Sequence, residues 1–189
     1  MLTPRSARAL PVALAVSLLA AGCSGGAPAE SPDASASDSP APMTVGALEL
    51  VPQTYLTAPV SEEDLSRVLV GGCADDAPCP GFVVLEGDAV AADAAEPVLD
   101  DGIACPGGEG LTPTEATVVE EADVTVAHGQ ARLTVFDVTC VGDVASEAVS
   151  VQQRQWVAEG PDGTVVVVDR WGLDGLDRAL AESAWTNAT

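Results

Sequence analysis

The feature that most constrains the fold is a series of β-branched segments with alternating apolar and polar residues in the C-terminal half of the chain. Such alternation is typical of strands whose two faces have different surroundings. His128-Gly129 has the two-residue spacing of a β-hairpin, and Gly160-Pro161-Asp162-Gly163 is a strong turn sequence. The sequence therefore predicts antiparallel strands at 117–127, 130–140, 147–159 and 164–171.

Apolar side chains occupy both faces of these predicted strands. Leu133 and Val135 lie on one face of their strand, and Phe136 and Val138 lie on the other. Because apolar surface is unstable in water, we expect a helix or loop to cover one face of the sheet.

Two further segments indicate helices. Ser61 is a suitable N-cap before acidic residues, Leu65, Val68 and Leu69 form an apolar face, and Gly71-Gly72 ends the segment. Residues 173–185 have Leu176, Leu180 and Trp185 at helical spacing. Residues 82–85 read as a short strand, and residues 87–113 read mostly as loop. The predicted fold class is α+β: a four-stranded antiparallel meander sheet, packed by one or two helices and stapled by disulfides.

Four cysteines fall in this predicted domain: Cys73, Cys79, Cys105 and Cys140. Four cysteines allow three pairings, and we favour Cys73–Cys79 and Cys105–Cys140. The first pair closes a small loop, and the second pins a Pro/Gly-rich loop to a strand end. A zinc site built from all four thiolates is the competing interpretation, although no C-x2-C spacing is present.

The chain is strongly acidic. It contains 29 Asp and Glu against 7 Lys and Arg, a formal charge of −22, and no lysine. Nucleic acids and anionic lipid surfaces bind clustered basic residues. The composition therefore argues against a nucleic-acid partner and favours a soluble, acidic domain.

The N-terminus carries an export signal. Arg5 and Arg8 precede an apolar stretch that is too short to span a bilayer, and small residues lead up to Cys23. Leu19-Ala20-Ala21-Gly22-Cys23 resembles the lipobox of bacterial lipoproteins. That resemblance implies attachment of a diacylglycerol to the Cys23 thiol, cleavage just before this residue, and anchorage on the extracytoplasmic face of the cell membrane. The alternative is an ordinary secretory signal that leaves Cys23 as a free thiol.

The composition of the residues after Cys23 predicts a disordered tether. Residues 24–42 contain only Ser, Gly, Ala, Pro, Glu and Asp, and such segments bury too little surface to fold. We therefore divide the chain into a signal peptide (1–22), a lipidated cysteine with a disordered tether (23–43), and a single extracytoplasmic domain (44–189).

The sequence offers no catalytic set, so we expect a protein that is not an enzyme. His128 is the only histidine and falls in a predicted turn. No G-x-S-x-G elbow, phosphate-binding loop or calcium-binding loop is present, although acidic pairs such as Asp100-Asp101 are common. We predict no cofactor and no metal.

Three side chains remain as candidates for ligand binding. Trp156 and Trp171 lie in neighbouring predicted strands, and Arg154 is close to Trp156 in sequence. Core packing is the simpler interpretation of the tryptophans, but a concave sheet face lined by all three could hold a small ligand. The sequence thus predicts a membrane-anchored lipoprotein with a non-catalytic binding or interaction domain. The alternatives are a small-ligand carrier or sensor and a cell-envelope enzyme accessory.

Overall fold

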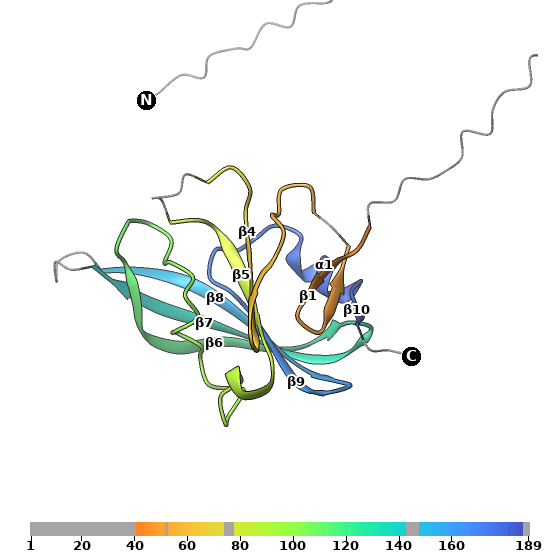
Figure 1. Ribbon diagram of the computed structural model, residues 1–189. Coiled ribbons are helices and arrows are strands. Elements are labelled where there is room, and N and C mark those ends of the chain that lie inside the picture. Colours follow the sequence, from red (N-terminus) through yellow and green to blue (C-terminus); the bar gives the residue numbers. More distant parts are fainter. Residues whose placement is uncertain (1–40, 52, 74–77, 143–147, 187–189) are drawn as a thin grey trace, which may run out of the picture. The chain divides into compact units, whose positions relative to one another are not determined.

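The computed structural model describes residues 41–51, 53–73, 78–142 and 148–186, all of which belong to one compact unit. The proposed signal, Cys23 and nearly all of the tether lie outside these residues. The fold is mostly β, with 52% of the described residues in strands and 7% in helices. The described strands form a sheet of seven strands and a smaller sheet of three (Figure 1).

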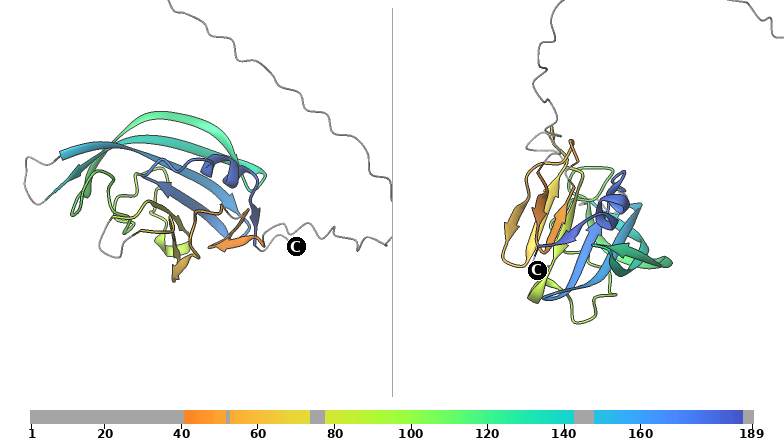
Figure 2. Two further views of the ribbon diagram at one scale, coloured as in Figure 1. Left: turned by 90° about the horizontal axis from the view of Figure 1, so that it is seen from above. Right: turned by 90° about the vertical axis from the view of Figure 1, so that its right-hand side faces the viewer.

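The large sheet is antiparallel throughout, in the order β3-β4-β5-β9-β8-β7-β6. Its longest strands lie at one side and bend along their length (Figure 2). The strands are, in chain order, β3 (Val60–Glu62), β4 (Leu65–Leu69), β5 (Gly81–Leu85), β6 (Thr112–Val126), β7 (Gly129–Val141), β8 (Ala148–Gly160) and β9 (Gly163–Asp169).

The small sheet and the helix cover one face of the large sheet. The small sheet has the order β1-β2-β10, from β1 (Met43–Val45), β2 (Leu48–Leu50) and β10 (Ala184–Trp185), and the helix is α1 (Leu176–Ala181). Leu48, Phe82, Trp156 and Leu180 belong to the apolar core between these layers.

The long connection between β5 and β6 covers the opposite face. It contains a short 3-10 helix, η1 (Gly87–Ala89), and otherwise consists of irregular backbone up to Thr112. Val83, Ile103 and Val168 pack beneath it in one cluster, and Phe136 and Val138 pack in another. The expected two-sided burial of the strands is therefore present, and a loop covers one side as predicted.

The C-terminal meander agrees with the sequence-based expectation. β6 to β9 correspond to the four predicted strands, and Leu133 packs on the opposite face from Phe136. The first turn lies one residue earlier than predicted, since Val126 pairs with Gly129. Ala127 and His128 form the turn with φ values of 47° and 61°, which is the two-residue geometry that follows the twist of a hairpin.

The α+β prediction is wrong, first because residues 61–70 form no helix. They contribute to the hairpin of β3 and β4, with Glu63 in its turn at a φ of 47°. β4 is sheltered on both faces: Val68 points into one core, while Leu65 and Leu69 pack against the other. Apolar residues on both faces of a strand fall at i, i+3 and i+4, which imitates a helical pattern.

The predicted C-terminal helix is also too long. α1 covers only Leu176–Ala181, and Trp185 lies in β10, paired with Leu48. Ser183 lies in the connection between them: its buried hydroxyl donates to the carbonyl of Leu180 at 2.6 Å and accepts from the N–H of Ala127 at 3.1 Å. These hydrogen bonds hold the end of the helix against the β6–β7 turn.

The core between the two sheets predicts a clear stability difference. Phe82→Ala should lower the free energy of unfolding by about 3–5 kcal/mol, because it leaves a cavity in a fully buried site. Val118→Ala, at a side chain that is 60% exposed, should change it by less than about 0.5 kcal/mol. Urea unfolding of both variants measures the difference, and equal losses would contradict the assigned core.

Candidate functional site

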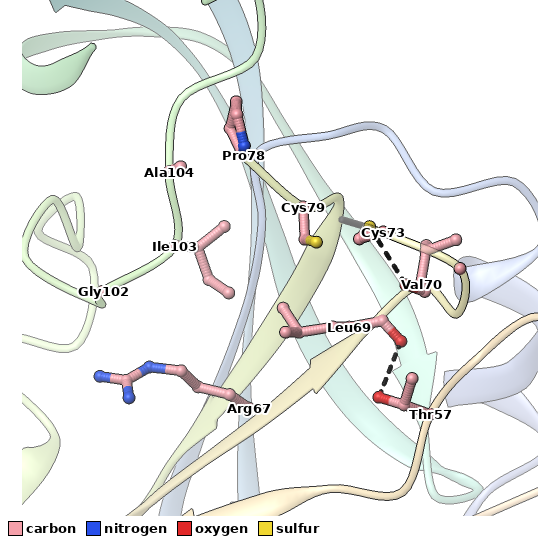
Figure 3. A pocket seen from close by; sticks show the side chains of 11 residues that line it. Thr57, Arg67, Leu69, Val70, Cys73, Pro78, Cys79, Gly102, Ile103 and Ala104 are labelled. Atoms are coloured by element: carbon pink, nitrogen blue, oxygen red, sulfur yellow. Dashed lines mark hydrogen bonds between the residues drawn. The ribbon is translucent and has the colours of Figure 1, made fainter. Parts of the chain in front are cut away.

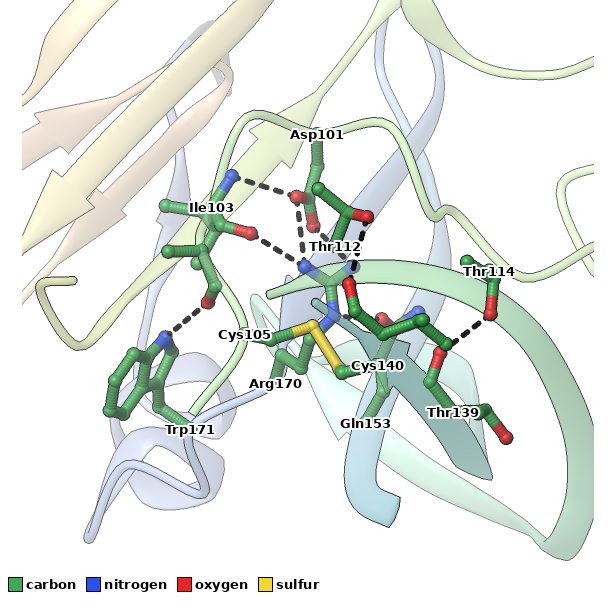
Figure 4. Close-up of a disulfide and its surroundings, with 12 residues drawn as sticks. Asp101, Ile103, Cys105, Thr112, Thr114, Thr139, Cys140, Gln153, Arg170 and Trp171 are labelled. Carbon is green, nitrogen blue, oxygen red and sulfur yellow. Dashed lines mark hydrogen bonds and ion pairs between the residues drawn. A yellow bond between two sulfur atoms is a disulfide. The ribbon is translucent and has the colours of Figure 1, made fainter. Parts of the chain in front are cut away.

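The segment 97–105 crosses the large sheet and forms one wall of the candidate site. A disulfide joins Cys105 at its end to Cys140 on β7 (Figure 4), which confirms that predicted pairing. Two buried glutamines of β8 hold the beginning of the crossing: Gln153 donates to the carbonyl of Val98 at 3.0 Å, and Gln155 accepts from its N–H at 3.1 Å. The segment is therefore fixed at both ends.

A buried ion pair holds the middle of the segment. Arg170 follows β9, and its Nη1 and Nη2 donate to Oδ1 and Oδ2 of Asp101 at 3.2 and 3.1 Å. The two side chains are 0% and 1% exposed. Arg170 also donates to the carbonyl of Ile103 at 2.8 Å and to Gln153 at 2.9 Å. Because these partners satisfy both charged groups, the pair is tolerated in the interior.

Burial raises the pKa of the Asp101 carboxyl above its ordinary value. The charge and hydrogen bonds of Arg170 and the N–H of Ile103, which donates to Oδ1 at 2.9 Å, act in the opposite direction. The ionised carboxylate therefore depends on the guanidinium beside it.

A pocket of about 430 Å³ lies between this segment and the end of β4 (Figure 3). Its apolar lining includes Leu69, Val70, Ile103 and Ala104, and its polar groups include Arg67. The same segment, Gly102 to Ala104, also lines a second pocket of about 430 Å³ that is bounded by residues 99–100 and 110–113. We consider the first pocket the better site, because it combines apolar walls with a cationic side chain.

Arg67 reaches across the pocket from β4. Its Nε donates to the carbonyl of Asp101 at 3.1 Å, and its Nη1 lies 3.7 Å from a carboxylate oxygen of Glu62. Gly102 lies against the guanidinium with a φ of 70°; a Cβ there would be only 2.4 Å from Nη2. The positive φ and this close approach favour glycine at position 102, and the Arg67 side chain, which is 31% exposed, is among those that line the pocket.

Cys73 and Cys79 line the same pocket from the connection between β4 and β5. The hairpin ladder extends past β4, since the N–H of Val70 donates to the carbonyl of Pro80 at 2.8 Å. The Cys73 thiol donates to the carbonyl of Val70 at 3.3 Å. Both cysteines thus lie where the hairpin opens into its loop, and a Cys73–Cys79 disulfide stays a prediction.

The structure brings the three predicted ligand-binding residues into one neighbourhood but places them outside the pockets described above. Trp156 is 2% exposed in the core, with the Arg154 guanidinium 5.1 Å from its ring centroid. Arg154 forms ion pairs with Asp169 and Asp177. Asp169 also accepts the backbone N–H of Trp171 at 2.9 Å, and the Trp171 indole donates to the carbonyl of Ala104. A ligand-binding role for the three stays a prediction.

Two further titratable groups of the described residues, His128 and Glu86, lie outside this pocket. His128 is exposed in the β6–β7 turn. Burial raises the pKa of Glu86, and the nearby carboxylates of Asp64 and Asp162 raise it further. Within residues 41–51, 53–73, 78–142 and 148–186, no group of three His, Cys, Asp or Glu side chains could hold a metal ion.

No protein-family model matches the chain, and searches of curated proteins and of solved structures likewise found no match. In the part of the chain that the structure describes, no helix is long and apolar enough to cross a membrane.

The buried ion pair predicts a pH-dependent loss of stability. In Arg170→Met, Asp101 keeps its burial but loses the opposing charge, so the free energy of unfolding at pH 7 should fall by about 3–5 kcal/mol. The folded-state pKa of Asp101 lies above its unfolded value and rises further in the variant. The free energy of unfolding therefore decreases as the pH rises from the unfolded-state pKa of Asp101 to its folded-state pKa. Relative to the unmodified chain at the same pH, the stability deficit should shrink as the pH is lowered from 7 through the raised folded-state pKa of Asp101.

Arg132→Met is the matched control for this measurement. Arg132 pairs with Glu121 and Asp123 on the exposed surface, so its loss should cost less than about 1 kcal/mol. Denaturant unfolding at several pH values tests both variants, and a deficit in Arg170→Met that does not change with pH would contradict the assignment.

Proposed function

We propose that this chain is a membrane-anchored lipoprotein whose extracytoplasmic domain binds a small molecule without transforming it. The anchor rests on the lipobox-like sequence before Cys23. The observation that carries the binding role is the pocket between the end of β4 and the segment 102–104. It has a fixed wall, apolar side chains and one cation.

The lining favours a small amphipathic anion. Leu69, Val70 and Ile103 suit an apolar body, and the partly exposed guanidinium of Arg67 suits a carboxylate or sulfonate. Burying about 100 Å² of apolar ligand surface contributes about 2.5 kcal/mol. A charge-assisted hydrogen bond contributes about 1.5–3 kcal/mol. Because the two contributions are similar, affinity should require both ends of the ligand.

The net charge of −22 opposes this ligand at long range. Added salt screens the repulsion between like charges, whereas the contact with Arg67 is short. Binding of an amphipathic anion should therefore tolerate moderate salt, in contrast to binding that relies on surface charge alone.

The role of Arg67 can be tested with anilinonaphthalene sulfonate, a fluorescent amphipathic anion. Arg67→Gln should weaken its binding to the purified full chain about tenfold, because the variant loses the charge-assisted contact. Ala104→Phe should also weaken binding, since the larger side chain fills part of the pocket. Fluorescence titration measures both effects.

Arg178→Gln provides the control, because it removes the same charge from the exposed surface of α1. It should leave the titration unchanged. Equal weakening by Arg67→Gln and Arg178→Gln would mean that the dye responds to net charge, and the pocket would then be rejected as its site.

Anchorage is tested separately by metabolic labelling with a fatty-acid probe. The unmodified chain should incorporate the label and fractionate with membranes, and Cys23→Ala should do neither, because the variant lacks the sulfur that would carry the diacylglycerol. Unchanged labelling of Cys23→Ala would disprove the lipid anchor while leaving the binding pocket in place.

A further inference from the structure

β6 is an unusually long and open edge of the large sheet. It pairs with β7 on one side only and ends the strand order opposite β3. β6 covers Thr112–Val126, whereas β3 covers only Val60–Glu62. In an antiparallel edge strand, every second residue directs its backbone N–H and C=O away from its neighbour. These groups are available to an added strand.

The middle of β6 is also exposed on both of its faces. Val118 and Val119 are 60% and 53% exposed, and they account for half of the exposed large apolar side chains among the described residues. They adjoin a bulge, where the register with β7 shifts between Val118 and Glu120. From Glu120 to Val126 the pairing is regular again, which leaves a stretch in continuous register that is long enough to receive a short peptide.

The charge of β6 selects among the strands that could pair with it. Glu115, Glu120, Glu121 and Asp123 lie on β6, which carries no basic residue. Pairing with β6 of a second copy would bring these acids together, and like charges on facing strands are destabilising. A cationic strand would instead place opposite charges across the new ladder.

The acids of β6 are only partly neutralised within the domain. Arg132 on β7 lies 3.8 Å from Glu121 and 3.5 Å from Asp123. Glu115 and Glu120 have no ion pair with any other described residue. Natural edge strands use bulges and charges to prevent self-association. β6 has both a bulge and acidic side chains, and neither prevents a basic strand from pairing with it.

We propose that the outer edge of β6, from Glu120 to Val126, is a docking site for an extended basic segment of a partner protein, which binds by adding a strand to the sheet. The backbone ladder supplies affinity, the acids select Lys and Arg at alternate positions, and Val118 and Val119 contact apolar side chains of the partner. This inference is independent of the pocket at Arg67, which lies near the other end of the strand order.

The experiment uses a capped octapeptide of alternating Lys and Val as the probe. Binding to the ¹⁵N-labelled full chain is followed by NMR. Amide shifts should map to β6 and its partner residues on β7, and slowed hydrogen exchange should appear at every second residue of β6. The same peptide N-methylated at every residue keeps its charge but loses the backbone donors of both strand edges, so it should bind at least about tenfold more weakly.

Two matched changes separate strand addition from simple charge attraction. Glu120→Lys should weaken binding of the Lys/Val peptide by about fivefold or more, whereas Glu96→Lys, the same change in an exposed loop residue, should have little effect. An octapeptide of alternating Glu and Val should not bind. Equal binding of the methylated and unmethylated peptides, shifts outside β6 and β7, or no binding at millimolar peptide would overturn the proposal.

Discussion

The buried contact between Arg170 and Asp101 is the interaction on which the candidate site depends. The connection between β5 and β6 has almost no secondary structure of its own, yet it must cover an apolar sheet face and present a fixed wall. One guanidinium, inserted from the end of β9, binds the Asp101 carboxylate and the carbonyls of Val98 and Ile103. A buried ion pair contributes little net stability when compared with apolar residues. Its partners in the loop lie between Val98 and Ile103, so the pair ties this part of the loop to the end of β9.

The meander of β6 to β9 could be predicted because the sequence features that define it lie close together along the chain. β6 to β9 follow one another along the chain, their turns have recognisable sequences, and their residues alternate. The strands of the N-terminal part lack such local features. β5 is buried on both faces, β4 carries apolar groups on both faces, and β1 and β2 are three residues long. Their partners are distant in sequence, as in the pairing of β10 with β2. Periodicity cannot reveal such contacts.

The candidate site was harder to predict than the strands. Its walls come from β4, the β4–β5 connection and residues 102–104, and only Cys73 and Cys79 stood out in the sequence as members of a pair. Arg67 is the only arginine of residues 61–70, the segment that was predicted as a helix, and it was not singled out by the sequence analysis. Arg154 and Trp156, which the sequence analysis singled out, instead contact each other, with the guanidinium over the indole ring. What distinguishes Arg67 from an exposed arginine such as Arg178 is that it lines a pocket, and the walls of that pocket are distant from one another in sequence.

The arrangement of the small sheet would have a mechanical consequence under the anchorage at Cys23 that we propose. β1 is the outermost strand of its sheet, and Met43, its first residue, pairs with Leu50 at the open end of the β1–β2 hairpin. Tension transmitted through the preceding residues would load the Met43–Leu50 pair first and the following pairs in succession, as in opening a zipper. The weakest point under a pulling force is therefore β1, and its release would absorb the strain before any strand of the large sheet separates.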